Sequence, residues 1–283
     1  MDYDKTKLPE TYAKSREPLY GKAEAECLEV RETMRDDGTK YGLLLEHLGP
    51  CRRLVDIGAG WGQFLALAGQ RVEEVWAVDE CPDRVKDLHK ACPKAKIVIC
   101  QADRLELPDD YFDAVVTSQM LHEVKLFGDE GELAQALSEI RRVLTKGGRY
   151  LLLDHQDAGD GEVVVHLLED QMATLGEFER KYRFYKAAHV AADSGKIRIF
   201  RRCLQDFLSK DWSLNSTMEE MEMKETHNVF EQHVTSELVT STGLKVREWI
   251  GFSDITADLA SHGGKLIEGD PWCRKFLLVT EKR

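Results

Sequence analysis

Apolar and polar positions follow two different periods along this chain. Short apolar runs bounded by turns predict buried strands, whereas apolar residues that recur every three or four positions predict amphipathic helices. Five strands are predicted in the first half, over residues 53–57, 74–79, 96–100, 111–118 and 150–154. Residues 129–144 carry an apolar stripe at helical spacing. Because strands alternate with helices, the pattern predicts an α/β fold with a doubly wound, mostly parallel sheet.

The whole chain divides into three predicted parts, which are an N-terminal segment, a core in two pieces and an insertion between those pieces. Residues 1–50 precede the first strand and form an N-terminal helical segment, with helices predicted over 24–34 and 40–48. The core comprises residues 51–155 and 235–283. Its second part has a helix followed by strands over 244–250 and 275–280.

Residues 156–234 are too long for a simple connection between core elements and should carry structure of their own. Helices are predicted there over residues 163–175, 178–192 and 197–208. We therefore expect a helical cap that is inserted after the fifth strand and covers the carboxyl ends of the fourth and fifth strands.

A glycine-rich turn follows the first strand. The run Val55-Asp56-Ile57-Gly58-Ala59-Gly60-Trp61-Gly62 has a glycine at every second position. Glycine adopts positive φ readily and leaves room for a ligand against the backbone. The turn also presents free N–H groups at a helix start, where a carboxylate, phosphate or ribose can bind. Its spacing differs from the Gly-x-Gly-x-x-Gly pattern of dinucleotide-binding folds.

Asp79 ends the second predicted strand, 23 residues after Asp56. An ionised carboxylate offers two acceptor oxygens, which match the two hydroxyls of a ribose. The interval from the glycine turn suits that role. Alternatively, Asp79 caps the helix that begins near Pro82.

Together these segments resemble the motifs of class I S-adenosylmethionine-dependent methyltransferases. The resemblance rests on Asp-x-Gly-x-Gly-x-Gly, on Asp79, on Gln101-Ala102-Asp103, and on the sequences FDAVVTSQMLHEV and LSEIRRVLTKGGRYLLLDH. It covers about residues 50–155 and points to the group that includes ubiquinone/menaquinone-biosynthesis and other small-molecule methyltransferases. It implies a Rossmann-like, seven-stranded sheet with an antiparallel last strand. It also implies S-adenosyl-L-methionine as cofactor, with S-adenosyl-L-homocysteine as product.

The same resemblance implies a set of cofactor-binding residues. Asp79 would bind the ribose, and Asp103 would bind the adenine with the backbone of Ala102, although Asp103 is also a plausible loop cap. Residues 1–50 would form a lid over the cofactor, and the cap of residues 156–234 would bind the acceptor. A tyrosine of the lid would face the sulfonium, although the tyrosines there are also plausible packing residues. The full set is Asp56, Gly58, Ala59, Gly60, Asp79, Glu80, Ala102, Asp103, Arg104, Ser118, Gln119 and Tyr20.

His122 and His155 follow the fourth and fifth strands, where the acceptor is expected. Histidine takes up a proton near neutral pH, so both are candidate catalytic residues, with Glu123 and Asp154 as neighbours that could orient them. The alternative is that each histidine is structural. The chain has no Cys/His set with metal-ligand spacing, and we expect no metal.

Composition limits the possible partners. The formal net charge of −12 argues against a nucleic-acid partner. Seven cysteines without a Cys-x-x-Cys pair favour a cytoplasmic location, and no segment predicts a membrane span. Charge in the cap is uneven: residues 177–210 hold nine basic and four acidic side chains, and residues 211–231 hold one and six. This suits either a basic patch or two facing segments of opposite charge.

The function that these observations favour is methyl transfer from S-adenosyl-L-methionine to a small-molecule acceptor by in-line displacement. One alternative is a tRNA- or protein-modifying methyltransferase that docks through the basic part of the cap. Another is a non-catalytic S-adenosylmethionine-binding protein. The acceptor, the methylated atom and the oligomeric state are not encoded in these motifs.

Overall fold

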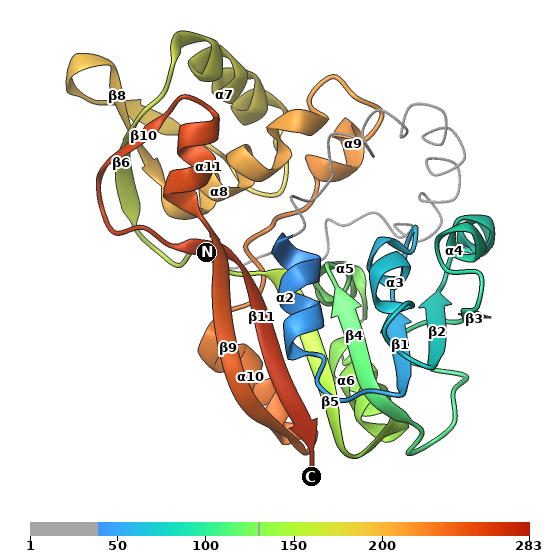
Figure 1. Cartoon of the computed structure of the whole chain (residues 1–283). Coiled ribbons are helices and arrows are strands. Elements are labelled where there is room, and N and C mark those ends of the chain that lie inside the picture. Colours follow the sequence, from blue (N-terminus) through green and yellow to red (C-terminus); the bar gives the residue numbers. More distant parts are fainter. Residues whose placement is uncertain (1–38, 130) are drawn as a thin grey trace. The chain divides into compact units, whose positions relative to one another are not determined.

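The computed structural model describes residues 39–129 and 131–283, which form two compact units (Figure 1). Within the described residues, the core unit comprises residues 39–157, 229–253 and 273–283. The inserted unit comprises residues 158–228 and 254–272. The chain therefore leaves the core unit twice, and both excursions contribute to the inserted unit.

The core unit is built on a seven-stranded sheet with the order β3-β2-β1-β4-β5-β11-β9. Its strands are β1 (Arg53–Ile57), β2 (Glu74–Asp79), β3 (Lys96–Ile99), β4 (Phe112–Ser118), β5 (Leu144–His155), β9 (Leu244–Asp254) and β11 (Cys273–Lys282). Neighbours from β3 to β5 are parallel, and β11 is antiparallel to β5. The predicted mostly parallel sheet with an antiparallel last strand is confirmed.

Helices cover both faces of this sheet (Figure 1). One face packs against α5 (Leu121–Phe127), α6 (Glu132–Val143) and α10 (Gln232–Ser241). The other packs against α2 (Thr39–His47), α3 (Gln63–Ala68) and α4 (Val85–Ala91), which follows the short helix η2 (Pro82–Arg84). Successive side chains of a strand point to opposite faces. Leu54 and Val55 of β1 accordingly enter different cores, and a strand buried on both faces becomes a continuous apolar run.

The inserted unit has its own antiparallel sheet with the order β10-β6-β8-β7. Its strands are β6 (Glu162–His166), β7 (His189–Ala191), β8 (Lys196–Phe200) and β10 (Lys265–Glu268). Its helices are α7 (Glu169–Lys181), α8 (Arg201–Lys210), α9 (Glu219–Glu222) and α11 (Ile255–Ser261), with the short helices η3 (Asp193–Gly195) and η4 (Asp211–Ser213). Val163 and Ile197 of the sheet pack with Phe178 and Phe207 of the helices in a separate core.

The helical cap predicted from the sequence is therefore wrong in part. The predicted helix over residues 163–175 begins as β6, the one over 197–208 begins as β8, and the one over 178–192 ends at Lys181. Consecutive β-branched valines and the alternation in Ile197-Arg198-Ile199 suit strands better than helices. In addition, residues 254–272, predicted as core, belong to the inserted unit.

None of the described helices is long and apolar enough to cross a membrane. The six cysteines within the described residues are free thiols.

Candidate functional site

The carboxyl ends of the parallel strands bring the predicted site residues to one edge of the core sheet. The strand order turns at β1, which has β2 on one side and β4 on the other. Ligands of open α/β sheets bind at such a switch point. The register places Ile57 beside Val78 and Thr117. The glycine turn after Ile57 therefore starts between the ends of β2 and β4.

The three glycines of the turn have different surroundings. Gly58, Gly60 and Gly62 have φ values of 71°, 54° and 77°, in the region that strains other residues. A Cβ added to Gly58 would lie 2.4 Å from Met120 Cγ, and one added to Gly62 would lie 2.8 Å from Ala91 Cβ. No atom of the described residues would lie within 4 Å of a Cβ on Gly60. Packing thus requires Gly58 and Gly62, whereas Gly60 faces open space that a ligand can enter.

Asp79 is hydrogen-bonded to the turn. Its Oδ2 accepts the Gly60 N–H at 2.8 Å, and its Oδ1 accepts the Cys81 N–H at 3.0 Å. The second bond is made to Cys81, which is the N-cap residue of η2. Because η2 has no side-chain capping hydrogen bond, the capping role of Asp79 considered from the sequence is not observed. Burial raises the pKa of Asp79, and the two backbone hydrogen bonds oppose that rise. Each carboxylate oxygen has further acceptor capacity, which ligand hydroxyls could use.

Asp56 lies under the turn and is only 2% exposed. Its Oδ1 has no hydrogen-bond partner among the residues that the structure describes. Burial, reinforced by the negative charge of Asp79, raises the pKa of Asp56 to about 8. Leaving a buried polar atom unpaired costs free energy. The atom therefore marks a place where a donor or a cationic group of a ligand would be stabilised.

The predicted adenine residues lie next along the same edge. Ala102 and Asp103 follow β3 and are half-buried, and the register places Ile99 at the end of β3 beside Asp79. Arg104 is exposed, and its backbone N–H donates to the carbonyl of Gln101 at 3.2 Å.

The remaining predicted residues occupy the ends of β2 and β4. Glu80 is exposed directly after β2, and Ser118 is half-buried at the end of β4. Tyr20 lies outside the described residues. The described members of the predicted cofactor set therefore come from four adjacent strand ends, although nothing in their sequence separation requires it.

His122 lies against Asp154. Its Nδ1 is 2.7 Å from Asp154 Oδ1, and its backbone N–H donates to Oδ2 at 3.1 Å. Asp154 is fully buried, and its Oδ1 also accepts the His155 backbone N–H at 2.8 Å. An ionised carboxylate only accepts hydrogen bonds, so the proton of neutral His122 lies on Nδ1. Its Nε2 then carries the lone pair, as a proton acceptor requires.

His155 has a different environment. Its ring lies edge-on to that of His122, with the ring centroids 5.0 Å apart. Its Nε2 is 3.1 Å from Gln119 Nε2. The two predicted catalytic histidines are thus neighbours, but one is bonded to a carboxylate and the other to an amide.

Comparison with known proteins agrees with this geometry. The family model of a methyltransferase domain matches residues 55–152. An uncharacterized methyltransferase of Mycobacterium tuberculosis is 35% identical over 98 residues, which are 35% of this chain and 37% of that protein. A ubiquinone/menaquinone biosynthesis C-methyltransferase of Burkholderia mallei is 31% identical over 115 residues, 37% of this chain and 44% of that protein. The chain thus spans less than half the length of these two relatives.

A solved structure gives the fold over a longer stretch. The 1,6-didemethyltoxoflavin-N1-methyltransferase of Burkholderia thailandensis matches with a TM-score of 0.53 at 13% identity, covering 97% of this chain and 92% of that chain. Residues 55–152 are a class I S-adenosylmethionine-dependent methyltransferase domain.

Two residues beside the glycine turn and the end of β4 were not predicted. Met120 packs over Gly58, and Lys40 Nζ donates to Gln119 Oε1 at 2.9 Å. Lys40 is 79 residues from Gln119, and no motif surrounds it. Gln119 also has a φ of 52°, which a non-glycine residue rarely adopts. Neither feature has a local sequence signal, because the Lys40 contact depends on the packing of α2 and the Gln119 N–H donates to the Leu153 carbonyl of β5.

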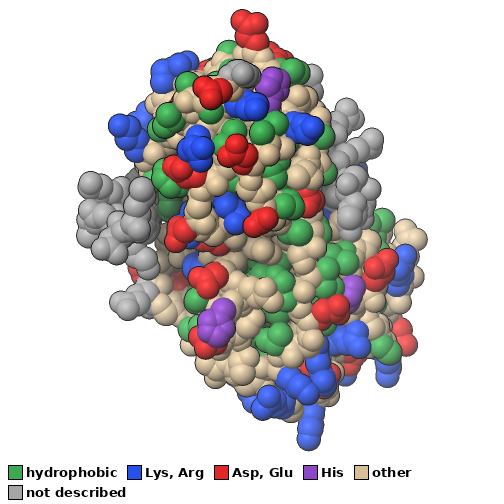
Figure 2. Space-filling model, turned by 90° about the vertical axis from the view of Figure 1, so that its left-hand side faces the viewer, with side chains coloured by type: hydrophobic (Ala, Val, Ile, Leu, Met, Phe, Trp, Pro, Cys, Tyr) green, Lys and Arg blue, Asp and Glu red, His purple; other side chains and the backbone are tan. Residues whose placement is uncertain are grey.

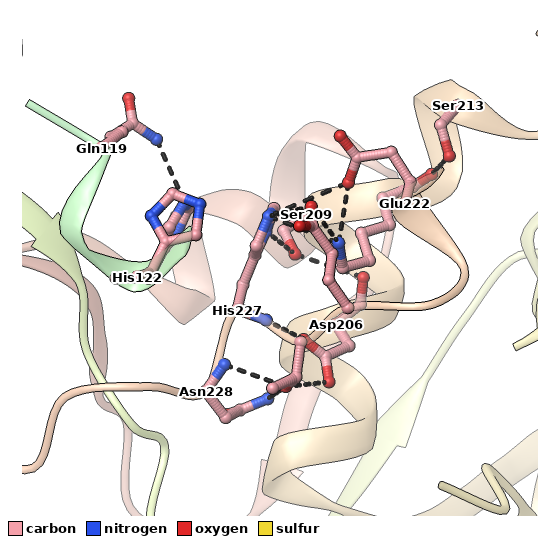
Figure 3. Close-up of polar contacts among 12 residues, drawn as sticks. Gln119, His122, Asp206, Ser209, Ser213, Glu222, His227 and Asn228 are labelled. Atoms are coloured by element: carbon pink, nitrogen blue, oxygen red, sulfur yellow. Dashed lines mark hydrogen bonds and ion pairs between the residues drawn. The ribbon is translucent and has the colours of Figure 1, made fainter. Parts of the chain in front are cut away.

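The inserted unit holds a buried ionic cluster of its own (Figure 3). Lys210 is fully buried, and its Nζ lies 2.7 Å from Glu222 Oε2, 3.2 Å from Glu225 Oε1 and 3.3 Å from His227 Nε2. These three acceptors match the three donors of an ammonium. They also lie within 4.8 Å of one another, a spacing that suits a metal, but here Lys210 supplies the positive charge. That the chain binds no metal stays a prediction.

Proton uptake by Glu222 also reduces the negative charge of this cluster. Burial, with a contribution from Glu225, raises the pKa of Glu222 to about 7, against the opposing effect of Lys210. Asp206 nearby is fully buried but well satisfied, because its Oδ2 accepts from the hydroxyls of Tyr182 and Tyr185 at 2.7 and 2.8 Å. The cluster therefore links α8 with the segment around residues 219–227.

The uneven charge of the insertion is partly neutralised within the inserted unit. Lys181 pairs with Glu219 at 2.7 Å, and Lys210 pairs with Glu222 at the same distance. In the upper part of Figure 2, acidic and basic side chains are intermixed on the face in view. These contacts support the interpretation that two segments of opposite charge face each other.

Proposed function

We propose that this protein transfers a methyl group from S-adenosyl-L-methionine to a small-molecule acceptor. The observation that carries the proposal is the glycine turn tied to Asp79 through the Gly60 N–H, beside the open space over Gly60. The methyltransferase family model covers the same residues. When bound, the cofactor supplies an electrophilic methyl group on a sulfonium.

The residues present suit this cofactor. We assign the ribose hydroxyls to Asp79, the adenine to Asp103 and the backbone of Ala102, and the cationic amino group to the unpartnered Oδ1 of Asp56. The turn of Gly58, Ala59 and Gly60 would approach the ligand through its backbone. Glu80, Arg104, Ser118 and Gln119 complete the proposed set at the same edge.

We assign the role of general base to His122, with Asp154 as the group that orients it. The 2.7 Å contact holds the proton on Nδ1 and would stabilise the imidazolium that forms when Nε2 takes a proton from the acceptor. Positioned bases of this kind contribute rate where the acceptor must lose a proton. His155 is the second candidate.

The choice of a small-molecule acceptor draws on two observations. The structurally similar protein of B. thailandensis is a 1,6-didemethyltoxoflavin-N1-methyltransferase with 1,6-didemethyltoxoflavin and S-adenosylhomocysteine bound. In addition, basic residues that a nucleic acid would need are paired with acidic ones, as in Lys181–Glu219. We further propose that the insertion selects the acceptor and that the protein acts in the cytoplasm.

The test is formation of S-adenosyl-L-homocysteine by purified protein given the cofactor and fractionated metabolite extract, followed by mass spectrometry of the methylated product. His122→Asn should lower kcat by about 10² to 10⁴ for an acceptor that must lose a proton, while cofactor affinity is retained. His89→Asn, at an exposed position of α4, is the matched control. Cofactor binding without product in any fraction would contradict methyl transfer and favour a non-catalytic binding protein.

A further inference from the structure

Lys40, Gln119 and His155 form a chain of polar contacts inside the core unit. Lys40 Nζ in α2 donates to Gln119 Oε1 at 2.9 Å. Gln119 Nε2 then lies 3.1 Å from His155 Nε2. The two contacts join α2, the end of β4 and the end of β5, so three separate elements fix one imidazole ring.

The contact with Lys40 determines which end of the Gln119 amide faces His155. An ammonium donates and never accepts, so the amide oxygen of Gln119 must face Lys40. The amide NH₂ must then face His155, where it can only donate. His155 Nε2 is therefore the acceptor, and the proton of the neutral ring lies on Nδ1.

The backbone of Gln119 supports the same arrangement. Its φ of 52° lies in the left-handed region, and its N–H donates to the Leu153 carbonyl at 2.8 Å. A non-glycine residue keeps this conformation only when its surroundings fix it. The conformation sets the direction in which the amide leaves the strand.

The charged groups around the two histidines favour protonation of the His122 ring and disfavour protonation of the His155 ring. Asp154 bonds to the His122 ring and favours its imidazolium, whereas its hydrogen bond with His155 is made to the backbone N–H. Protonation of His155 at Nε2 would place two donors in contact, and turning the Gln119 amide to relieve this would oppose its NH₂ to Lys40.

We propose that Lys40 is a positioning residue that, through Gln119, holds His155 as the neutral Nδ1–H tautomer and reserves the role of proton acceptor for His122. The tautomer follows from the contacts alone. The division of roles rests on the proposed function.

The test is nuclear magnetic resonance of the full chain labelled with ¹⁵N in its histidine rings, because ring nitrogen shifts distinguish the two tautomers and the imidazolium. His155→Gln assigns the signal by its loss. The wild type should show His155 with Nδ1–H, and Lys40→Arg should keep that pattern, as should Lys86→Met at an exposed position of α4. Lys40→Met should lose the single pattern, because the amide is then free to turn.

A second variant, Gln119→Glu, tests the proposal even if Lys40→Met does not fold well. In Gln119→Glu the side chain only accepts, so the His155 proton should move to Nε2. An Nε2–H or imidazolium pattern in the wild type, or an unchanged pattern in both Lys40→Met and Gln119→Glu, would overturn the proposal. A parallel cofactor titration separates the two hypotheses, since absence of binding would contradict the proposed function and leave the tautomer result standing.

Discussion

Asp56 is a buried carboxyl group whose chemistry should depend on the ligand. Its raised pKa of about 8 means that the proton is mostly bound at neutral pH. A cationic ligand group beside Oδ1 would favour the ionised form, because opposite charges stabilise each other strongly where water is excluded. Cofactor binding below about pH 8 should therefore release a proton from Asp56.

The first prediction concerns the pH dependence of that binding. Between about pH 6 and about pH 7, the affinity of the wild type for S-adenosyl-L-methionine should rise by up to about tenfold, since the ionised carboxylate becomes more abundant toward its pKa. Asp56→Asn should bind more weakly, with a flatter pH profile, in calorimetric titrations. Asp83→Asn, exposed on η2, is the control. Equal pH slopes in Asp56→Asn and the wild type would contradict the assignment.

Single residues differ in how much of their role the sequence reveals. The three glycines were predicted to need special backbone conformations, and all three have positive φ. Asp79 was predicted at the end of a strand, and it lies there. The contact of Lys40 with Gln119 was not predicted, because it depends on tertiary packing between residues 79 positions apart.

At the scale of elements, the sequence predicts the strands of the core unit better than those of the inserted unit. The central strands β1 and β4 are buried on both faces, so their apolar runs identify them, and β1 and β2 have the predicted bounds. The strands of the inserted unit are short, and β10 pairs with β6 across about 100 residues of chain. A local period cannot reveal such a pairing, and the helical prediction failed there.

The second prediction concerns α8 and the segment that faces it. Lys210→Met would leave Glu222 and Glu225 buried without their cation, and breaking a buried ion pair costs about 3 kcal/mol or more. Part of this loss is offset because Glu222, with a pKa of about 7, can take up a proton. Hydrogen exchange should therefore become faster in peptides from α8 and α9.

The core unit supplies the internal control for this experiment. Peptides from β4 and β5 should exchange at wild-type rates in Lys210→Met, because the two units have separate hydrophobic cores. Unchanged exchange in α8 would contradict a stabilising role of the cluster. Equally faster exchange in β4 would indicate that the variant destabilises the whole chain instead.

The whole molecule consists of a core unit that contains the family match and an inserted unit that lies outside it. The family match covers residues 55–152, which lie in the core unit, and identifies the cofactor fold. The inserted unit adds a second sheet and a second core between parts of that fold. The cofactor could therefore be predicted from sequence motifs, whereas those motifs do not identify the acceptor.

The most direct measurement is calorimetric titration of S-adenosyl-L-methionine into the purified full chain. We predict saturable binding with a Kd on the order of 1 μM. Asp79→Ala should lose about 100-fold in affinity, because hydrogen bonds to a charged group contribute about 1.5–3 kcal/mol each. Asp83→Ala should bind like the wild type. Absence of binding to the wild type, or unchanged affinity in Asp79→Ala, would contradict the assignment of this turn as the cofactor site.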